Sequence, residues 1–469
     1  MTNSKSRFTL GLALACAAIT FSVAVGAQAQ SVTVIAAESS LGMVQATDGN
    51  FYGAGNTPGN FNGGIFRMTP AGEISTVYGF CSQLNCSDGT QATPPILGSD
   101  GNLYGVAKFG GNSTGSGTFY KLTLDGKLTV LYTFCPNAGC ADGQYPEGVI
   151  LASDGNFYGT TEVGGATDGH SGTIFRITPA GAFKLLYTFC SLANCADGTG
   201  APSPPVQGSD GNFYGLAVFG GATGHGVVYR LTSAGAYTVL YNFCSATDCL
   251  DGNQPQAVTW RPSGTLLGVT NLGGDRNGGT IFEINLTKNH FRTLHSFDAS
   301  VDGGNPFYTP TLANDGNFYG VVGDPYAAGY IFEVTPAGVY TSLYNFACCG
   351  LGTNPFGPLL QATSGKLFGE MEYSHHVTNS GSIFQLLNGI GPSVQPVPVA
   401  GKVGQNIIIL GNGLTGSTMV TFNGVAAAFT VESDTYIKAR VPLGATTGTV
   451  SVVTSTGALN SNPHFVVTK

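Results

Sequence analysis

The residues with the most evident chemistry are eight cysteines that occur as four pairs. Four residues separate the members of each pair, namely Cys81 and Cys86, Cys135 and Cys140, Cys190 and Cys195, and Cys244 and Cys249. Paired cysteines can ligate zinc, but metal-binding pairs usually lie closer together and need further His or Cys ligands, which these pairs lack nearby in the sequence. In an exported chain the repetition predicts four local disulfide bonds, with no metal and no cofactor.

Aspartates recur at a fixed point after these cysteines and once more further along the chain. Each is followed by glycine: Asp88, Asp142, Asp197, Asp251 and Asp302. A ring of carboxylates could hold calcium, but Asp-Gly is also a common turn in which the aspartate side chain bonds its own backbone. The sequence favours the turn.

Seven polar residues depart from an otherwise repeated framework, and these are the binding candidates. They are Asp168, His170, His225, Asp275, Arg276, Glu370 and His375. Neighbouring imidazoles could bind metal or act as bases, but these histidines belong to separate repeats, so we expect solvated loop residues. No Ser-His-Asp, Cys-His or paired-carboxylate arrangement stands out, and no catalytic residue is assigned.

The framework that must position these residues is a motif that recurs seven times, as in Asp-Gly-Asn-Phe-Tyr-Gly at 154–159. Its last glycines are 49 to 56 residues apart, at Gly53, Gly105, Gly159, Gly215, Gly268, Gly320 and Gly369. Each copy carries four strand signals separated by turn signals. Four antiparallel strands per repeat predict one blade of a β-propeller, in the length range of kelch repeats. A solenoid is the alternative, but seven copies suit a closed ring.

The seventh copy has signals for only three strands, around 359–362, 366–370 and 382–387. Residues 31–36, with the sequence SVTVIA, have the β-branched character of the fourth strands in other copies. We therefore expect this segment to pair as the outer strand of the last blade, which removes an exposed edge and joins the two ends of the ring.

The order Asp-Gly-Asn-Phe-Tyr-Gly, Gly-Gly, Gly-Thr-Ile-Phe-Arg, Thr-Pro-Ala-Gly and Leu-Tyr-Thr-Phe resembles the GloVer tandem-repeat family of exported bacterial proteins. The resemblance covers about residues 41 to 388, and the fifth and seventh copies depart from it at 262–265 and 364–366. It implies a propeller-like exported protein and no particular activity.

Residues 391 to 469 change character, because short strand signals spaced by turns predict a small β-sandwich. The stretch GNGLTGSTMVTFNGVAAAFTVESDTYIKARVPLGATTGTVSVVT at 411–454 resembles an IPT/TIG immunoglobulin-like domain. Such a domain implies a spacer or an adhesion module.

The first 29 residues have the pattern of a signal peptide, with Lys5 and Arg7, an apolar run, and Ala-Gln-Ala at 27–29. Cys16 could instead carry a lipid, but Ala13 stands where that signal prefers leucine. No other apolar run is long enough to cross a bilayer, so we expect no transmembrane segment in the mature chain. Cys348 and Cys349 could form a vicinal disulfide or remain free thiols.

These signals predict an all-β protein in three parts. The expected division is a signal peptide at 1–29, a seven-bladed kelch-like β-propeller at 30–388 with 31–36 closing the last blade, and an IPT/TIG immunoglobulin-like β-sandwich at 389–469. The composition agrees, since 71 Gly, 29 Phe and 20 Tyr with 9% charged residues favour strands and tight turns. A net charge of -8 without a basic cluster excludes a nucleic-acid surface.

Blade topology sorts the connections onto two faces. Asp-Gly and Pro-Ala-Gly turns share one face, the short-turn face, and are too short to build a pocket. Gly-Gly loops and the cysteine-containing connections share the other, the long-loop face, where we expect any site. The leading hypothesis is a non-catalytic binding or scaffold protein, secreted, periplasmic or on the cell surface, that recognises a polysaccharide or a surface protein there.

Two alternatives remain open. The first is an extracellular carbohydrate-active enzyme, because a seven-bladed kelch-like ring before an immunoglobulin-like domain resembles the layout of galactose oxidase. That family's copper site needs converging Tyr and His with a Tyr-Cys crosslink, whereas the cysteines here come in regular pairs. The second is a purely structural envelope component. The sequence favours a protein that is not an enzyme.

Overall fold

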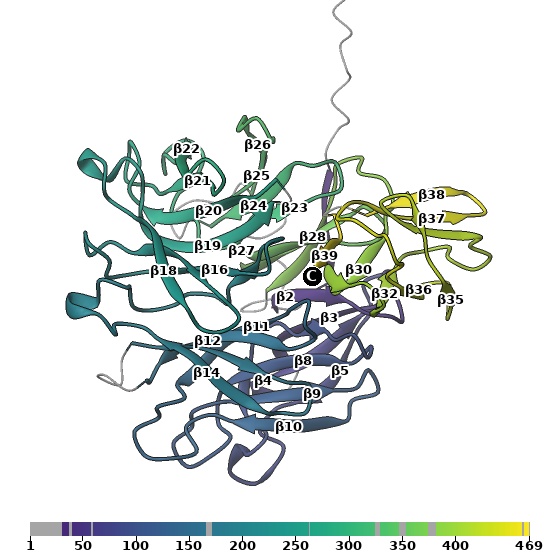
Figure 1. The fold of residues 1–469 in the computed structure, drawn as a ribbon, viewed down its shortest axis with the longest axis horizontal. Helices are drawn as coiled ribbons and strands as arrows, with labels where there is room; N and C mark the ends of the chain where they lie inside the picture. The colour runs from purple at the N-terminus through teal and green to yellow at the C-terminus, as the bar shows by residue number, and fades with distance from the viewer. Residues whose placement is uncertain are drawn as a thin grey trace, which may run out of the picture.

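A computed structural model describes residues 31–36, 40–57, 60–165, 171–261, 263–323, 329–346, 353–373, 381–461 and 464–468. The expected signal peptide and the Cys348-Cys349 pair lie outside these residues. The described residues form strands, β1 to β39, and three short 3-10 helices (Figure 1). The expected all-β class is therefore confirmed. Within the same residues, no helix has the length and apolar character needed to span a membrane.

One sheet shows how the repeated motif folds. It contains β11 (Gln144–Leu151), β12 (Phe157–Val163), β13 (Thr173–Ile177) and β14 (Phe183–Thr188), all antiparallel and in chain order. Between β11 and β12, one Asp154 oxygen accepts the backbone N–H of Asn156 at 3.0 Å. Its other oxygen accepts the Asn156 amide at 2.8 Å and the Tyr158 hydroxyl at 2.9 Å. The Asp-Gly-Asn-Phe-Tyr motif is thus a hairpin closed by its own side chains.

The same arrangement recurs in the described residues before 388. The first sheet has β2 (Ser40–Gln45), β3 (Phe51–Thr57), β4 (Asn60–Met68) and β5 (Ile74–Gly79), and the second has β6 (Thr90–Ala92), β7 (Ile96–Leu97), β8 (Leu103–Phe109), β9 (Thr118–Leu122) and β10 (Leu128–Thr133). After the sheet of β11 to β14 come β15 (Val206–Gln207), β16 (Phe213–Ala217), β17 (Val227–Leu231) and β18 (Tyr237–Asn242), then β19 (Asn253–Arg261), β20 (Thr265–Leu272), β21 (Thr280–Asn285) and β22 (His290–Ser296). The sixth sheet has β23 (Thr311–Leu312), β24 (Phe318–Val322), β25 (Tyr330–Val334) and β26 (Tyr340–Asn345). The 3-10 helices η1 (Leu84–Cys86), η2 (Ala193–Cys195) and η3 (Thr247–Cys249) lie between sheets.

The last sheet of the repeat region contains strands from both ends of that region. Its order is β1 (Ser31–Ala36), β29 (Ser382–Leu387), β28 (Leu367–Tyr373) and β27 (Thr353–Gln361), with Val32 opposite Leu386. A Cβ on Gly72 would lie 2.5 Å from the Ile35 carbonyl oxygen, just as a Cβ on Gly181 would meet the Leu131 carbonyl oxygen. β1 therefore contacts the turn between β4 and β5 of the first sheet in the same way that β10, a fourth strand, contacts the turn between β13 and β14.

Aromatic side chains of the motif pack between neighbouring sheets. Tyr158 stacks on Phe213 with centroids 4.0 Å apart. Phe51 of the first sheet meets Phe368 of the last at 4.8 Å, inside a buried cluster that both sheets share. The repeated phenylalanines are core residues, as expected, since Phe157 is 1% exposed.

The C-terminal region forms its own small β-sandwich. One sheet holds β30 (Gln395–Val397), β32 (Asn406–Leu410), β36 (Tyr436–Arg440) and β35 (Phe429–Val431), and the other holds β34 (Val425–Ala426), β33 (Met419–Phe422), β37 (Val450–Thr454) and β38 (Gly457–Asn460). β31 (Ala400–Lys402) and β39 (Val466–Thr468) pair in parallel. Val420, Phe422 and Ile437 are completely buried between the sheets.

This sandwich packs against the short-turn face of the repeat region. The Asn412 amide donates to the Thr363 hydroxyl at 2.6 Å, and the Ser393 amide donates to the Thr363 carbonyl at 2.9 Å. Ile408 and Leu410 join the buried core of the first two sheets. In Figure 1 the strands of the sandwich lie to one side, while the C-terminus ends near the middle of the view.

Candidate functional site

Disulfide bonds close four of the connections on the long-loop face. Each joins the two cysteines of one pair, so the predicted local pairing is confirmed. The first cysteine follows the fourth strand after one phenylalanine. In three of the four connections a 3-10 turn ends at the second cysteine. Local crosslinks of this kind fit an oxidising, extracellular environment.

A carboxylate organises each of these loops, and in three of the four it is buried. Asp197 is 0% exposed and accepts the Tyr187 hydroxyl at 2.6 Å, the Ser191 hydroxyl at 2.8 Å, and the backbone N–H groups of Ser191 and Leu192 at 2.9 and 3.2 Å. Burial alone would raise the pKa of Asp197, but the hydrogen bonds from Tyr187, Ser191 and Leu192 outweigh it and hold that pKa below its ordinary value. Burial, followed by the bond to Asp197, raises the pKa of Tyr187.

The other aspartates of this series behave alike. Asp88 and Asp251 accept the equivalent tyrosine, serine and backbone donors. The expected turn, with the side chain bonded to the backbone that follows it, is therefore wrong for these aspartates: their carboxylates accept hydrogen bonds from residues that precede them, because the disulfide loop folds back over them.

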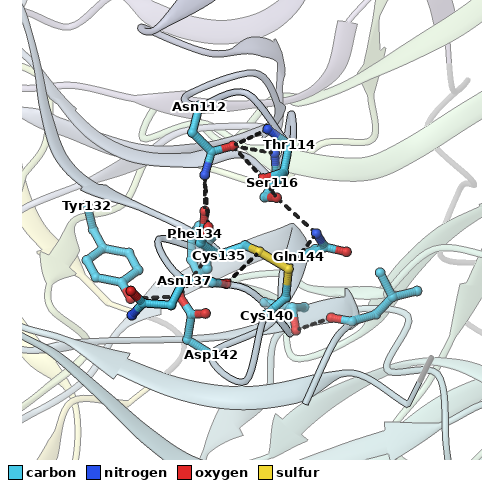
Figure 2. The surroundings of a disulfide bond; sticks show 12 residues. Asn112, Thr114, Ser116, Tyr132, Phe134, Cys135, Asn137, Cys140, Asp142 and Gln144 are labelled. Carbon is cyan, nitrogen blue, oxygen red and sulfur yellow. Dashed lines mark hydrogen bonds between the residues drawn. A yellow bond between two sulfur atoms is a disulfide. The ribbon is translucent and has the colours of Figure 1, made fainter. Parts of the chain in front are cut away.

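Figure 2 shows the second disulfide loop, in which Asp142 accepts a different backbone donor. Pro136 follows the first cysteine and has no N–H to offer, so Asp142 accepts the backbone N–H of Cys135 at 3.0 Å along with the Tyr132 hydroxyl at 2.7 Å. A residue from another connection also holds this loop, because the Asn112 amide donates to the carbonyls of Phe134 and Cys135 at 2.8 and 3.0 Å. Asp142 therefore still organises its loop, although one backbone donor is Cys135 and not the residue that follows it.

Each disulfide loop is tied to the next sheet by the Gly-Gly connection. The N–H of Gly221 donates to the Cys195 carbonyl at 2.9 Å, and Gly111, Gly165 and Gly274 donate to the carbonyls of Cys86, Cys140 and Cys249 in the same way. A Cβ on Gly220 would lie 2.5 Å from the Cys195 oxygen, so a larger residue would push the two connections apart. The long-loop face is consequently built on a hydrogen-bonded scaffold.

Three of the binding candidates gather around the fourth disulfide. His225 lies in the loop from β16 to β17, and ligand-type atoms of His225, Cys244 and Cys249 all lie within 4.8 Å of one another. The expectation that the cysteine pairs lack a nearby histidine is therefore wrong for Cys244 and Cys249. The contact was missed because His225 precedes β17 and Cys244 follows β18, so only the pairing of these two strands brings the residues together.

Asp275 and Arg276 approach the same disulfide from the next sheet. They follow Gly274, whose N–H donates to the Cys249 carbonyl at 3.0 Å. Both are exposed, and Arg276 Nε lies 3.7 Å from a carboxylate oxygen of Asp298, with 74% of the arginine side chain exposed. Such a pair contributes little to stability and leaves the guanidinium accessible to a ligand.

The remaining candidates separate from this group. Glu370 lies within β28 and is 1% exposed, so it belongs to the interior and not to a rim loop. Asp168, His170 and His375 lie outside the described residues.

Of the exposed apolar side chains of the long-loop connections, the sequence singled out only Phe307, as aromatic surface that could stack on sugars. Six large ones project there, from 44% to 85% exposed: Leu84, Leu192, Phe219, Leu250, Val301 and Phe307. Leucine and phenylalanine are usually core residues in a repeat, so their exposure became visible only once the strands had been placed.

Two further features were also missed. Lys108 Nζ bridges Glu147 and Glu162 of the next sheet at 2.8 and 2.9 Å, and burial raises the pKa of Glu147 although Lys108 opposes this. In addition, a cleft of about 500 Å³ opens on the short-turn face, lined by Asp154, Asp210 and Lys402 among others. Short turns alone could not form it, but the C-terminal sandwich supplies its second wall.

Comparison with known proteins agrees with this architecture. The family model described as the Gloeobacter/Verrucomicrobia repeat matches residues 13–199 and 191–384. The chain belongs to this family. An IPT/TIG domain model matches residues 392–467, directly after the Gloeobacter/Verrucomicrobia repeats. Repeats and sandwich together indicate an extracellular-type binding or scaffold protein. No curated protein matches the sequence.

Solved structures share only the fold with this member of the family. The extracellular domain of a "putative hybrid two component system" from B. thetaiotaomicron is 10% identical, with a TM-score of 0.50 over 94% of this chain and 59% of its own. A "putative gluconolactonase" is 12% identical, with a TM-score of 0.39 over 77% of this chain and 93% of its own. A puromycin hydrolase mutant is 13% identical, with a TM-score of 0.46 over 71% of this chain and 50% of its own. The first of these neighbours is β-propeller-like, and at such identities none of them assigns an activity to this chain.

Proposed function

We propose that this protein is exported and acts as a non-catalytic binding or scaffold protein, with a seven-bladed, kelch-type propeller over residues 30–388 as its recognition domain and β1 closing the last blade. Residues 1–29 direct export, and the sandwich over 389–469 acts as a spacer. The ligand is a polysaccharide, or alternatively a surface protein, held across the long-loop face.

The observation that carries this proposal is the distribution of exposed apolar side chains. Leu84, Leu192 and Leu250 project from loops closed by disulfides, and Phe219 projects from a Gly-Gly connection that is hydrogen-bonded to such a loop. Val301 and Phe307 project from the connection between β22 and β23, which Asp302 organises without a disulfide. Exposed apolar groups cost solvation free energy, and on a rigid scaffold they mark interaction surfaces. The sandwich packs against the opposite face and leaves these connections accessible.

Chemistry on this face suits sugars. Phe219 and Phe307 are 49% and 52% exposed and offer rings for stacking on the apolar face of a sugar. Asp275 and Arg276 offer hydrogen-bond acceptors and donors for hydroxyl groups. Because these groups line a surface and not an enclosed pocket, each monosaccharide is held weakly, and a polymer gains affinity by contacting several positions.

A glycan-array screen with the purified mature protein tests the proposal. We expect binding to one class of polysaccharide without release of product. Phe219→Ala and Arg276→Ala should each weaken binding by about tenfold, while Val339→Ala, which removes an exposed apolar side chain beside a short turn, should leave it unchanged.

Two results would contradict the proposal. Turnover of a sugar by the purified protein would make it an enzyme. Binding that depends on Lys402 of the short-turn cleft, and not on Phe219 or Arg276, would place the site on the wrong face. Binding to a surface protein in place of a glycan, lost in the same two variants, would keep the face and change the ligand.

A further inference from the structure

We propose that the Cys244–Cys249 disulfide is the switch of a redox-controlled metal site. In the reduced protein, the two thiolates and the His225 imidazole bind Zn²⁺ or another thiophilic divalent cation. This inference does not depend on the ligand of the long-loop face.

The spacing of the three groups suits such a site. One potential ligand atom from each of His225, Cys244 and Cys249 lies within 4.8 Å of the other two. In a tetrahedral zinc site with bonds of about 2.0 to 2.3 Å, ligand atoms lie about 3.5 to 3.8 Å apart. Breaking the S–S bond lets the two sulfurs move apart to that separation, so only small side-chain movements are needed.

One nitrogen of the imidazole is held by a hydrogen bond. His225 Nδ1 lies 3.1 Å from the Asn253 side-chain oxygen, which accepts hydrogen bonds. Nδ1 therefore carries the proton, and the lone pair of Nε2 is available. A metal-binding histidine is typically held in this way, with its second nitrogen bonded to a carbonyl or carboxylate oxygen.

Among the described residues, the other disulfide loops lack this arrangement. His225 directly precedes Gly226. In the two preceding sheets, the residue directly before the equivalent glycine is Ser116 or Ser171. At the second disulfide, Cys140 Sγ instead meets the Gln144 amide nitrogen at 2.8 Å, a donor that cannot ligate a cation. Within the described part of the chain, His225 with Cys244 and Cys249 is the one group of three such side chains close enough to hold a metal.

The chemistry balances with a thiol reductant. Two thiols of the reductant are oxidised to a disulfide, and their two electrons and two protons convert Cys244–Cys249 into two cysteine thiols. Binding of a divalent cation then releases both thiol protons, while neutral His225 contributes a lone pair and releases none. A water molecule completes the tetrahedral coordination. All three residues are half-buried, so reductant and cation can reach them.

Cobalt titration of the full mature chain tests the proposal. The protein is reduced without oxygen by a phosphine, which is itself oxidised to the phosphine oxide, and Co²⁺ is added. We expect one tight equivalent, with thiolate-to-cobalt charge-transfer absorption and the strong visible bands of a tetrahedral site. The oxidised protein should show neither. His225→Ser, which installs the residue of the neighbouring repeats, should weaken binding by more than tenfold, and Asn253→Ala by about tenfold.

Cys190→Ala with Cys195→Ala is the matched control, because it removes another disulfide and should leave the tight site intact. Hydrogen exchange on the reduced protein checks that the fold persists. An unchanged affinity and spectrum in His225→Ser would overturn the proposal. So would global unfolding on reduction, since the site then never forms in the folded protein.

Discussion

Replacing Asp197 by alanine should open the third disulfide loop although its disulfide remains. The carboxylate is fully buried and accepts four hydrogen bonds, from Tyr187, Ser191 and Leu192. The loop between β22 and β23 indicates which element matters, because it has no cysteines and still keeps a carboxylate in this place. There Asp302 accepts the N–H of Asp298 at 2.9 Å and pairs with His295 at 2.6 Å.

The expected cost is about 2 to 3 kcal/mol. Not all of the orphaned donors stay unpaired in the variant. The Tyr187 and Ser191 hydroxyls already lie 2.8 Å apart and can bond each other, and Leu192 is 56% exposed, so its N–H can reach water. The Ser191 N–H loses its carboxylate partner. By comparison, removing a disulfide that closes a loop of about six residues costs about 2 kcal/mol on the chain-entropy model.

Hydrogen exchange with chemical denaturation measures the effect. The Ser191 amide should exchange about 30-fold faster or more, since 1.4 kcal/mol corresponds to a factor of ten. Asp275→Ala, which removes an exposed aspartate from the same face, should change stability by less than about 0.5 kcal/mol. If Asp197→Ala costs no more than this control, the carboxylate does not organise the loop.

Three further predictions concern pH, ring closure and packing. Because the folded pKa of Asp197 is depressed, its stabilisation is complete above the unfolded value of about 3.9 and is lost as pH falls through the folded value, so the acid limb of a stability–pH curve should flatten in Asp197→Asn. Deleting Ser31–Ala36 should lower the melting temperature of the whole repeat region by several degrees, because β29 then becomes an open edge; an unchanged melt would refute closure by this strand. Gly226→Ala should destabilise by about 1 to 3 kcal/mol more than Gly224→Ala. Both glycines have positive φ, but a new Cβ meets Pro255 at 2.5 Å only in the first case, and equal unfolding midpoints would contradict this reading.

The repeated parts of the fold could be predicted from the sequence because each is a local rule. Asp154 and Gly155 make a hairpin whatever surrounds them, and the spacing of Cys190 and Cys195 leaves no partner nearer than each other. The segment SVTVIA was likewise recognisable by its β-branched residues, and the structure pairs it with β29.

The site was harder to predict because its contacts join residues from different connections. His225 and Cys244 stand far apart along the chain, and only the packing of two loops reveals that they meet. Glu370 looked like a rim residue because its repeat departs from the consensus, yet the pleat of β28 turns it inward. The short-turn cleft depends on where the C-terminal sandwich docks, which no local pattern specifies.

The most direct test of the account maps where the ligand sits. Once a glycan is identified, hydrogen exchange with and without it should show protection in the connections that carry Phe219, Leu250 and Arg276, with no change in the Asp-Gly-Asn turns. Protection confined to those turns and to the cleft beside Lys402 would contradict recognition through the long-loop face.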